Sequence, residues 1–215
     1  MGSNPILSAI KRVIKKAGHP MKLGIISDTH IPGGAPEVPT QVIKAFKGVD
    51  LILHAGNIYT SDVLDWLEQI APVKAVGSMD GDRREHPLGF NMEGHGDPRI
   101  DKQQILNIEG HTIGLVNNLE MRGMSDEVKP GFIGSQTFQR KSLTEMVHEF
   151  FGQPVNIVVF GRTHHSMIEE HEKILFLNPG SPTLPKNLIQ LGSVAILDLT
   201  SKTKSATLIE LSELA

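Results

Sequence analysis

Residues 22–30 read KLGIISDTH, an apolar run over Lys22–Ser27 that is followed at once by the polar residues Asp28 and His30. A short apolar run with such a boundary is typical of a buried β-strand. Further elements follow in alternation: a helix over 41–47 with Thr40 as its expected N-cap, a strand over 50–54, a helix over 61–70 and a strand over 73–76. This order predicts parallel strands joined by right-handed crossovers.

The second half of the chain shows a different pattern, in which strands pair locally. VNIVVF at 155–160 predicts another buried strand, and 139–151 has the apolar stripe of a helix. Hairpins are expected from 103–109 with 112–117, from 167–170 with 174–177 and from 194–199 with 207–211. We therefore predict an α/β fold, a four-layer α-β-β-α sandwich of two mixed sheets, forming a single domain over 21–215. The aperiodic segments 81–102 and 119–136 are expected to be long functional loops.

The composition narrows the class of protein. The 215 residues carry 21 Lys+Arg against 24 Asp+Glu, a net charge of −3, which argues against general nucleic-acid binding. No cysteine is present, so disulfides, thiol catalysis and Cys-based zinc sites are excluded, and a reducing, cytoplasmic location is expected. No apolar run reaches the roughly 18 residues that a membrane span needs, so no transmembrane segment is expected.

The first 20 residues differ from the rest in charge. They contain Lys11, Arg12, Lys15 and Lys16 and no acidic residue, with apolar residues at helical spacing on the other face. The segment 1–20 is thus expected to be a basic amphipathic N-terminal helix or a tag-derived arm. Two interpretations stay open: a helix that docks on the body of the protein, and one that binds a membrane surface or a partner.

Polar residues follow each expected strand at its carboxyl end. In α/β sheets, ligands gather at this edge. Asp28 and His30 follow the first strand and His164 follows VNIVVF, a set of one carboxylate and two imidazoles that suits a divalent cation. The other strand ends carry Gly56-Asn57, GSMD at 77–80, Asn117-Asn118 and NPGS at 178–181.

These segments, SDTH, HAGN, VGSMD, GLVN, VVFGRTHH and NPGS, occur in the order found in a known family. From Met21 to the C-terminus the chain resembles the calcineurin-like metallophosphoesterases. Within them it is most similar to the small bacterial and archaeal phosphodiesterases, which share their fold with the retromer scaffold subunit. The resemblance implies the α-β-β-α sandwich and a two-metal site that activates water against a phosphate ester.

Several ligand positions of that family's pattern are altered in this chain. Asp28 and His30 keep the D-x-H motif, and His164 keeps the last histidine. The bridging aspartate is replaced by Asn57, and an asparagine ligand by Ser78, although Asp80 remains. Asn117 and Arg162 each stand where the family has a histidine.

The resemblance therefore implies one strong metal site at most, with ligands Asp28, His30, His164 and Asn57, the last as a neutral oxygen donor. Manganese, zinc or iron would fit the imidazoles, and loss of the metal altogether is the other outcome. Arg162 would bring a permanent positive charge to the place of the second cation. There it could bind phosphate together with Ser78 and Asn117, or pair with Asp28 or Asp80 in a closed cavity.

Two functions stay open at this point. One is a metal-dependent phosphodiester or phosphate-ester hydrolase of weak or altered activity, with Asp28, His30, Asn57, Arg162 and His164 in the site. The other is an inactive scaffold or binding protein on the same fold. A phosphate-containing small molecule or free oxyanion is the expected ligand, and a protein partner or a second copy is an open possibility. His54 is expected to be a hydrogen-bonded core residue, and His165 is the less favoured alternative ligand.

Overall fold

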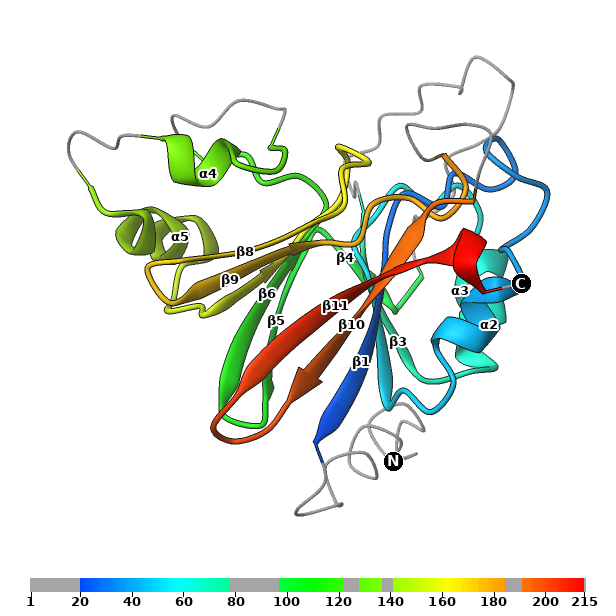
Figure 1. Cartoon of the computed structure of the whole chain (residues 1–215), viewed down its shortest axis with the longest axis horizontal. Coiled ribbons are helices and arrows are strands. Elements are labelled where there is room, and N and C mark those ends of the chain that lie inside the picture. The colour runs from blue at the N-terminus through cyan, green and yellow to red at the C-terminus, as the bar shows by residue number, and fades with distance from the viewer. Residues whose placement is uncertain (1–19, 78–96, 122–127, 137–140, 185–190, 215) are drawn as a thin grey trace.

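The computed structural model describes residues 20–77, 97–121, 128–136, 141–184 and 191–214, which form two β-sheets with helices on their outer faces (Figure 1). Residues 1–19 of the predicted arm 1–20, together with Ser78 and Asp80, lie outside the described residues. No helix in the described ranges is both long and apolar enough to cross a membrane.

The first sheet has six strands in the order β11-β10-β1-β2-β3-β4. Its parallel part consists of β1 (Met21–Ile26), β2 (Leu51–His54), β3 (Val73–Val76) and β4 (Ile100–Asp101), and β10 (Ser193–Leu199) and β11 (Lys204–Glu210) add an antiparallel hairpin beside β1. A short 3-10 helix over Leu211–Glu213 follows β11.

The second sheet has five strands in the order β5-β6-β7-β9-β8. Its members are β5 (Gln103–Ile108), β6 (His111–Val116), β7 (Ile157–Val159), β8 (Met167–His171) and β9 (Ile174–Asn178). Strands β6, β7 and β9 are parallel, whereas β5 and β8 pair antiparallel at the two edges. Both sheets are thus mixed, as the sequence predicts.

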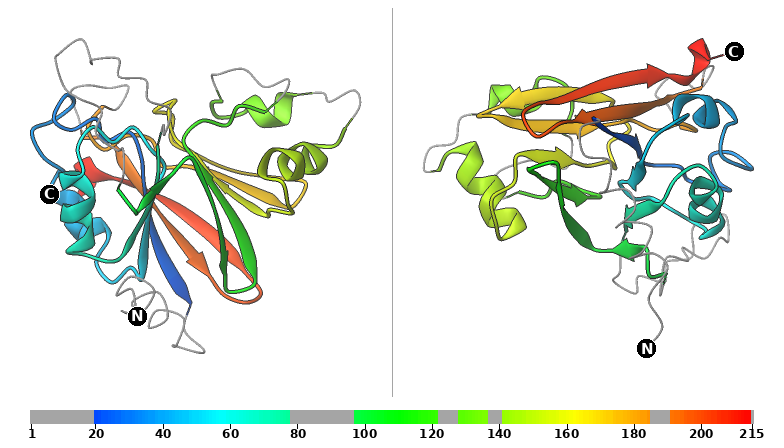
Figure 2. Two further views of the ribbon diagram at one scale, coloured as in Figure 1. Left: turned by 180° about the vertical axis from the view of Figure 1, so that it is seen from behind. Right: turned by 90° about the horizontal axis from the view of Figure 1, so that it is seen from below.

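Apolar residues fill three layers of core. Leu23, Ile25 and Leu53 of the first sheet meet Ile113 and Val159 of the second between the two sheets. The outer face of the first sheet packs on α2 (Gln41–Ala45) and α3 (Asp62–Glu68), and that of the second on α4 (Phe132–Ser135) and α5 (Leu143–Phe151). Figure 2 shows these helices outside the paired sheets. The predicted α-β-β-α sandwich is confirmed.

Three local expectations differ from the structure. Thr40 precedes α2, but its side chain makes no capping hydrogen bond, so the predicted N-cap is wrong. The complete capping box is at α5 instead, where Ser142 and Glu145 bond to each other's backbone N–H. The expected loops 81–102 and 119–136 also contain regular structure, namely β4 and α4, because pairing with β3 and packing on the second sheet stabilise these short pieces.

The carboxyl ends of β1 and β2 and the segment after β7 converge at one edge of the sandwich. The backbone N–H of Asp28 donates to Gly56 O at 2.9 Å, and that of Gly161 donates to Asn117 O at 3.0 Å. Gly161 must be glycine, because a Cβ there would lie 2.8 Å from Ala55 O and 2.9 Å from Asp28 Oδ2. This close approach joins the two sheets where the predicted site residues lie.

Candidate metal centre

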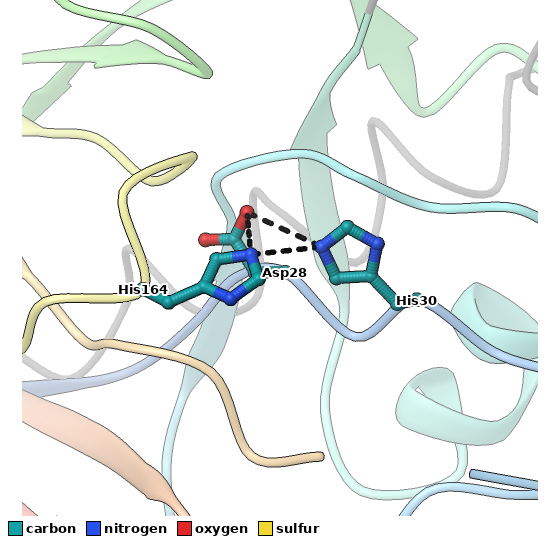
Figure 3. Close-up of side chains that lie close together, drawn as sticks. All are labelled: Asp28, His30 and His164. Atoms are coloured by element: carbon teal, nitrogen blue, oxygen red, sulfur yellow. Dashed lines mark hydrogen bonds and ion pairs between the residues drawn. The ribbon is translucent and has the colours of Figure 1, made fainter. Parts of the chain in front are cut away.

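Asp28, His30 and His164 come together at this edge, with ligand atoms all within 4.8 Å of one another (Figure 3). The two Nε2 atoms of the imidazoles lie 3.0 Å apart and form a hydrogen bond. Asp28 Oδ1 is 3.8 Å from Nε2 of His30 and 3.6 Å from Nε2 of His164. The structure therefore assembles the three residues that the sequence analysis places in one metal site.

The carboxylate of Asp28 has no exposed surface and is held by three donors. Ser27 Oγ donates to Oδ2 at 2.6 Å, and the backbone N–H of Arg162 donates to both oxygens at 2.9 and 3.0 Å. Asn57 Nδ2 donates to Oδ1 at 2.6 Å. Burial nevertheless raises the pKa of Asp28 to about 6, since desolvation outweighs the hydrogen bonds and the nearby imidazole of His164.

The remote nitrogen of each imidazole also has an oxygen partner. His164 Nδ1 lies 3.2 Å from the carbonyl oxygen of Leu184, and His30 Nδ1 lies 2.5 Å from the hydroxyl of Tyr59. Burial, with the charge of Asp28 as a smaller cause, raises the pKa of Tyr59. Histidines that bind metals are commonly oriented in this way by a second hydrogen bond.

The backbone at this edge is unusual. Eight described non-glycine residues have positive φ, and five of them are predicted site residues, with φ of 53° at Asp28, 46° at His30, 59° at Asn57, 67° at Arg162 and 55° at His164. Left-handed backbone costs free energy for side-chain-bearing residues and clusters at functional sites. Left-handed backbone is thus concentrated in the loops that carry the predicted site residues, a feature that the sequence pattern does not reveal.

Asn57 and Arg162 lie beside the carboxylate in ways that the sequence leaves open. Asn57 presents its amide nitrogen, which also approaches Nε2 of His30 at 3.3 Å. Arg162 contacts Asp28 through its backbone, while its side chain is exposed and forms no hydrogen bond or ion pair with the described residues. The expected ion pair between the guanidinium and Asp28 is therefore wrong, whereas Asp80, the other expected partner, lies outside the described residues.

The remaining candidate residues are placed as follows. Asn117 Nδ2 donates to Ala55 O at 2.8 Å, and the side chain lies against Gly56, next to Asn57. His54 is fully buried and hydrogen-bonded, so the core interpretation is confirmed: Nδ1 accepts from Gly56 N–H at 3.1 Å and Nε2 lies 3.2 Å from Thr29 Oγ1. Burial lowers the pKa of His54 to about 3, which keeps it neutral.

Two groups of residues were missed by sequence reasoning. Ser27 and Tyr59 form hydrogen bonds with the triad, and the only available signal was their position, Ser27 as the first residue of SDTH and Tyr59 two residues after HAGN. A pocket of about 180 Å³ also opens beside His164 and is lined mostly by polar residues, which come from distant segments: His164, His165, Ser166, Ser181, Gly192, Ser193 and Glu210. No spacing pattern relates these segments, because only the packing of the two sheets brings them together.

Comparison with known proteins identifies the family. The profile described as "Calcineurin-like phosphoesterase superfamily domain" matches residues 21–202. The chain belongs to this superfamily. A probable metallophosphoesterase of Methanothermobacter thermautotrophicus is 32% identical over 166 residues, which cover 77% of this chain and 80% of the relative. The family resemblance deduced from the motifs is confirmed.

Solved structures agree with the calcineurin-like fold. Vacuolar protein sorting 29 of Cryptosporidium parvum is similar with a TM-score of 0.60 at 20% identity, covering 90% of this chain and 99% of that one. A structure described as a novel archaeal phosphodiesterase is similar with a TM-score of 0.54 at 20% identity, covering 88% and 100%. The fold is thus shared by a sorting protein and by an enzyme, and likeness at this level does not separate the two functions.

Calcineurin-like phosphoesterases are metal-dependent, and the donor set of this chain fits a divalent cation. Bonds of about 2.0–2.2 Å to one ion place neighbouring ligand atoms roughly 3.0–3.5 Å apart. The three separations among the triad atoms are 3.0, 3.6 and 3.8 Å. No movement larger than a few tenths of an ångström is needed for all three to reach a common ion.

Proposed function

We propose that the protein is a metal-dependent phosphoester hydrolase of the phosphodiesterase type that works with one strongly held cation. The observation that carries this proposal is the triad of Asp28, His30 and His164, whose ligand atoms lie within 4.8 Å of one another. Two imidazoles and a single carboxylate favour manganese, zinc or iron over magnesium.

The number of cations follows from the residues around the triad. Asn57 would be the fourth ligand after a flip of its side-chain amide, which would exchange the positions of Nδ2 and Oδ1 and turn the oxygen toward the cation. A second cation would lack carboxylates, since Asn57, Ser78 and Asn117 are all neutral, and would meet the charge of Arg162. Two-metal sites need anionic oxygens that hold both ions roughly 3.5–4 Å apart. We therefore propose a mononuclear site with weak or altered activity.

When bound, the cation would supply Lewis-acid polarisation of the phosphoryl oxygen and a more acidic water. The protein's own residues would position the ester. Arg162, with an exposed guanidinium, would bind two phosphoryl oxygens and stabilise the charge that develops on them, assisted by Ser78 and Asn117. The 180 Å³ pocket beside His164 would accept the esterified group.

Water is the nucleophile in this proposal, because the serine at the triad is not suited to the role. Ser27 is fully buried, and its hydroxyl is engaged by Asp28 Oδ2 at 2.6 Å and Gly180 O at 2.9 Å. A nucleophilic serine needs an exposed hydroxyl with a base that takes its proton. Ser27 instead stabilises the carboxylate.

Metal content and hydrolysis of bis-p-nitrophenyl phosphate test the proposal together. We expect about one equivalent of manganese or zinc per chain after dialysis, and metal-dependent hydrolysis. His164→Asn, which tolerates the left-handed backbone, should lose the metal and the activity. The matched control His165→Asn, one residue along the chain, should retain the metal. Two equivalents that survive dialysis, or full metal content in His164→Asn, would contradict the mononuclear site.

The alternative is a scaffold that binds a protein partner. The observation that favours it is an apolar groove of about 270 Å³ adjoining His30, lined by Ile31, Pro32, Pro36, Glu37, Val38, Thr60, Asp62, Val63 and Trp66. Binding of one cation without any hydrolysis of activated phosphodiesters would favour this second function.

A further inference from the structure

The two imidazoles of the triad are oriented by different kinds of oxygen. His164 Nδ1 faces the carbonyl of Leu184 at 3.2 Å. A carbonyl oxygen only accepts, so this hydrogen bond puts a proton on Nδ1 of His164 and points its Nε2 toward Asp28. His30 Nδ1 instead faces the hydroxyl of Tyr59 at 2.5 Å, a group that can both donate and accept.

A cation at the triad determines which of these roles Tyr59 plays. A metal ligand must give the lone pair of Nε2, and a neutral imidazole then keeps its single proton on Nδ1. His30 would therefore donate from Nδ1 to the Tyr59 oxygen, as His164 donates to Leu184. With Tyr59 as acceptor, both imidazoles present an unprotonated Nε2 to the cation.

We propose that Tyr59 is the positioning residue of the metal centre: its hydroxyl holds the ring orientation of His30 and accepts the Nδ1 proton of His30 when a cation is bound, and thereby raises the affinity for the cation. This inference rests on the proposed metal site and deepens it. Tyr59 acts through His30 and touches neither the cation nor a substrate.

The surroundings of Tyr59 hold its ring in place for this role. The rings of Tyr59 and His30 meet edge to face, with centroids 4.9 Å apart and planes at 82°. A Cβ added at Gly33 would lie 3.5 Å from Tyr59 Cε2, so the loop after His30 packs along the tyrosine ring. The loops of β1 and β2 are also joined directly, because His30 N–H donates to Asn57 O at 3.1 Å. The hydroxyl is thus fixed relative to His30 from both loops.

Tyr59 is the only tyrosine in the chain, which makes a direct test possible. We would label the protein with 13Cζ-tyrosine, titrate it with zinc alone and follow the single tyrosine resonance together with the 15N signals of the histidine rings. The expected result is a shift of the tyrosine resonance that saturates at one equivalent of zinc, with His30 protonated at Nδ1.

The variant Tyr59→Phe removes only the hydroxyl. We expect it to bind zinc about 10- to 100-fold more weakly, the range typical of lost outer hydrogen bonds to metal ligands. The metal-free variant should melt within a few degrees of the parent. Thr60→Val, which removes the hydroxyl of the next residue, is the matched control and should bind zinc like the parent.

The outcomes separate this inference from the proposed function. If the parent binds one zinc but Tyr59→Phe binds it equally well, or the tyrosine resonance does not respond, the role of Tyr59 is refuted while the metal centre stands. A large loss of thermal stability in metal-free Tyr59→Phe would reduce Tyr59 to a structural residue and also refute the inference. If the parent binds no zinc, the proposed function fails and the inference with it.

Discussion

Asn57 donates a hydrogen bond across 2.6 Å from Nδ2 to Oδ1 of Asp28, at the position where the family pattern has a bridging aspartate. The amide thereby satisfies a buried carboxylate that two further donors also hold. An uncompensated carboxylate with no exposed surface would cost several kcal/mol. Asn57 therefore stabilises the site without a cation, at the expense of the anionic charge that would attract a second one.

The substitution Asn57→Asp tests whether residue 57 stabilises the metal-free site at the expense of metal affinity. Two carboxylates would then face each other at hydrogen-bonding distance, so we expect the metal-free variant to melt at a lower temperature than the parent at pH 8. Manganese should bind at least 10-fold more tightly, because the added charge faces the cation. Calorimetric titration and thermal melts with and without manganese check both effects. Equal affinity for manganese in parent and variant would show that residue 57 does not face the ion.

The raised pKa of Asp28 makes the stability of the metal-free protein depend on pH. The pKa is about 6 in the folded state against 3.8 for an ordinary aspartate, so the folded state binds the proton more tightly. The resulting stabilisation is complete below pH 3.8 and is lost as pH rises through 6, with a full amplitude of about 3 kcal/mol. In urea unfolding, the parent should gain this stabilisation as pH falls from 7.5 to 4.5, whereas Asp28→Asn, which has no carboxyl group at this position, should not. A pH-independent difference between the two proteins would contradict it.

His54 shifts the stability in the opposite direction. Its pKa is about 3 when folded against 6.5 ordinarily, so the unfolded state binds the proton more tightly. Folding is therefore penalised increasingly as pH falls below 6.5, by an amount that approaches about 5 kcal/mol near pH 3. In urea unfolding, the free energy of unfolding of His54→Gln should decrease less than that of the parent as pH falls below 6.5. The control Thr29→Val removes the hydroxyl partner of His54 Nε2 and should show the same dependence of the free energy of unfolding on pH as the parent. Equal slopes in His54→Gln and the parent would contradict the burial of a neutral imidazole.

Arg162 offers a test of phosphate binding that leaves the metal ligands intact. Only its backbone N–H contacts Asp28, so Arg162→Asn, which suits the left-handed backbone, should retain the metal. Inorganic phosphate should then bind roughly 10- to 100-fold more weakly, as the loss of charge-assisted hydrogen bonds implies. Arg162→Lys keeps the positive charge but not the planar guanidinium, so its affinity for phosphate should lie between those of the parent and Arg162→Asn. Phosphate binding is measured by thermal shift of the manganese-loaded protein. Unchanged binding in Arg162→Asn would show that the Arg162 side chain does not bind phosphate.

The fold was predictable because its central strands, such as β2, β7 and β9, are buried on both faces. The stretches LGII at 23–26 and IVVF at 157–160 have no polar interruption, and the polar residues that follow them mark the sheet edge where Asp28 and His164 meet. Caps and short elements were less predictable. Thr40 makes no cap, and the short helix α4 owes its position to packing on the second sheet rather than to a local signal.

The details of the site were not predictable for a related reason. Tyr59 is 29 residues from His30 in sequence, and Leu184 is 20 residues from His164. The left-handed backbone of Asp28, His30 and His164 likewise results from loops tied together across the sheet edge. Polar residues at strand ends predict candidate metal ligands, whereas the groups that orient these residues depend on tertiary contacts.

A fourfold substitution that restores the family's ligand set should recover a second cation. Arg162→His alone is expected to achieve little, because Asn57, Ser78 and Asn117 would still leave that cation without a carboxylate. Adding Asn57→Asp, Ser78→Asn and Asn117→His supplies the bridge and the remaining ligands. The change at 117 breaks the hydrogen bond to Ala55 O, which costs about 1 kcal/mol. We expect two equivalents of manganese in the fourfold variant.

Hydrolysis of bis-p-nitrophenyl phosphate should then be far faster in the fourfold variant than in the parent. The effects of the single substitutions on this rate should be strongly non-additive, because residues that share one metal act as a unit. Parent activity equal to that of the variant would instead make Arg162 a working replacement for the second cation. A variant that binds two cations and stays inert would locate the lost function in the substrate cleft. Failure to take up the second cation would show that positions 57, 78, 117 and 162 do not face a common ion, since Asp28, His30 and His164 alone already account for the first.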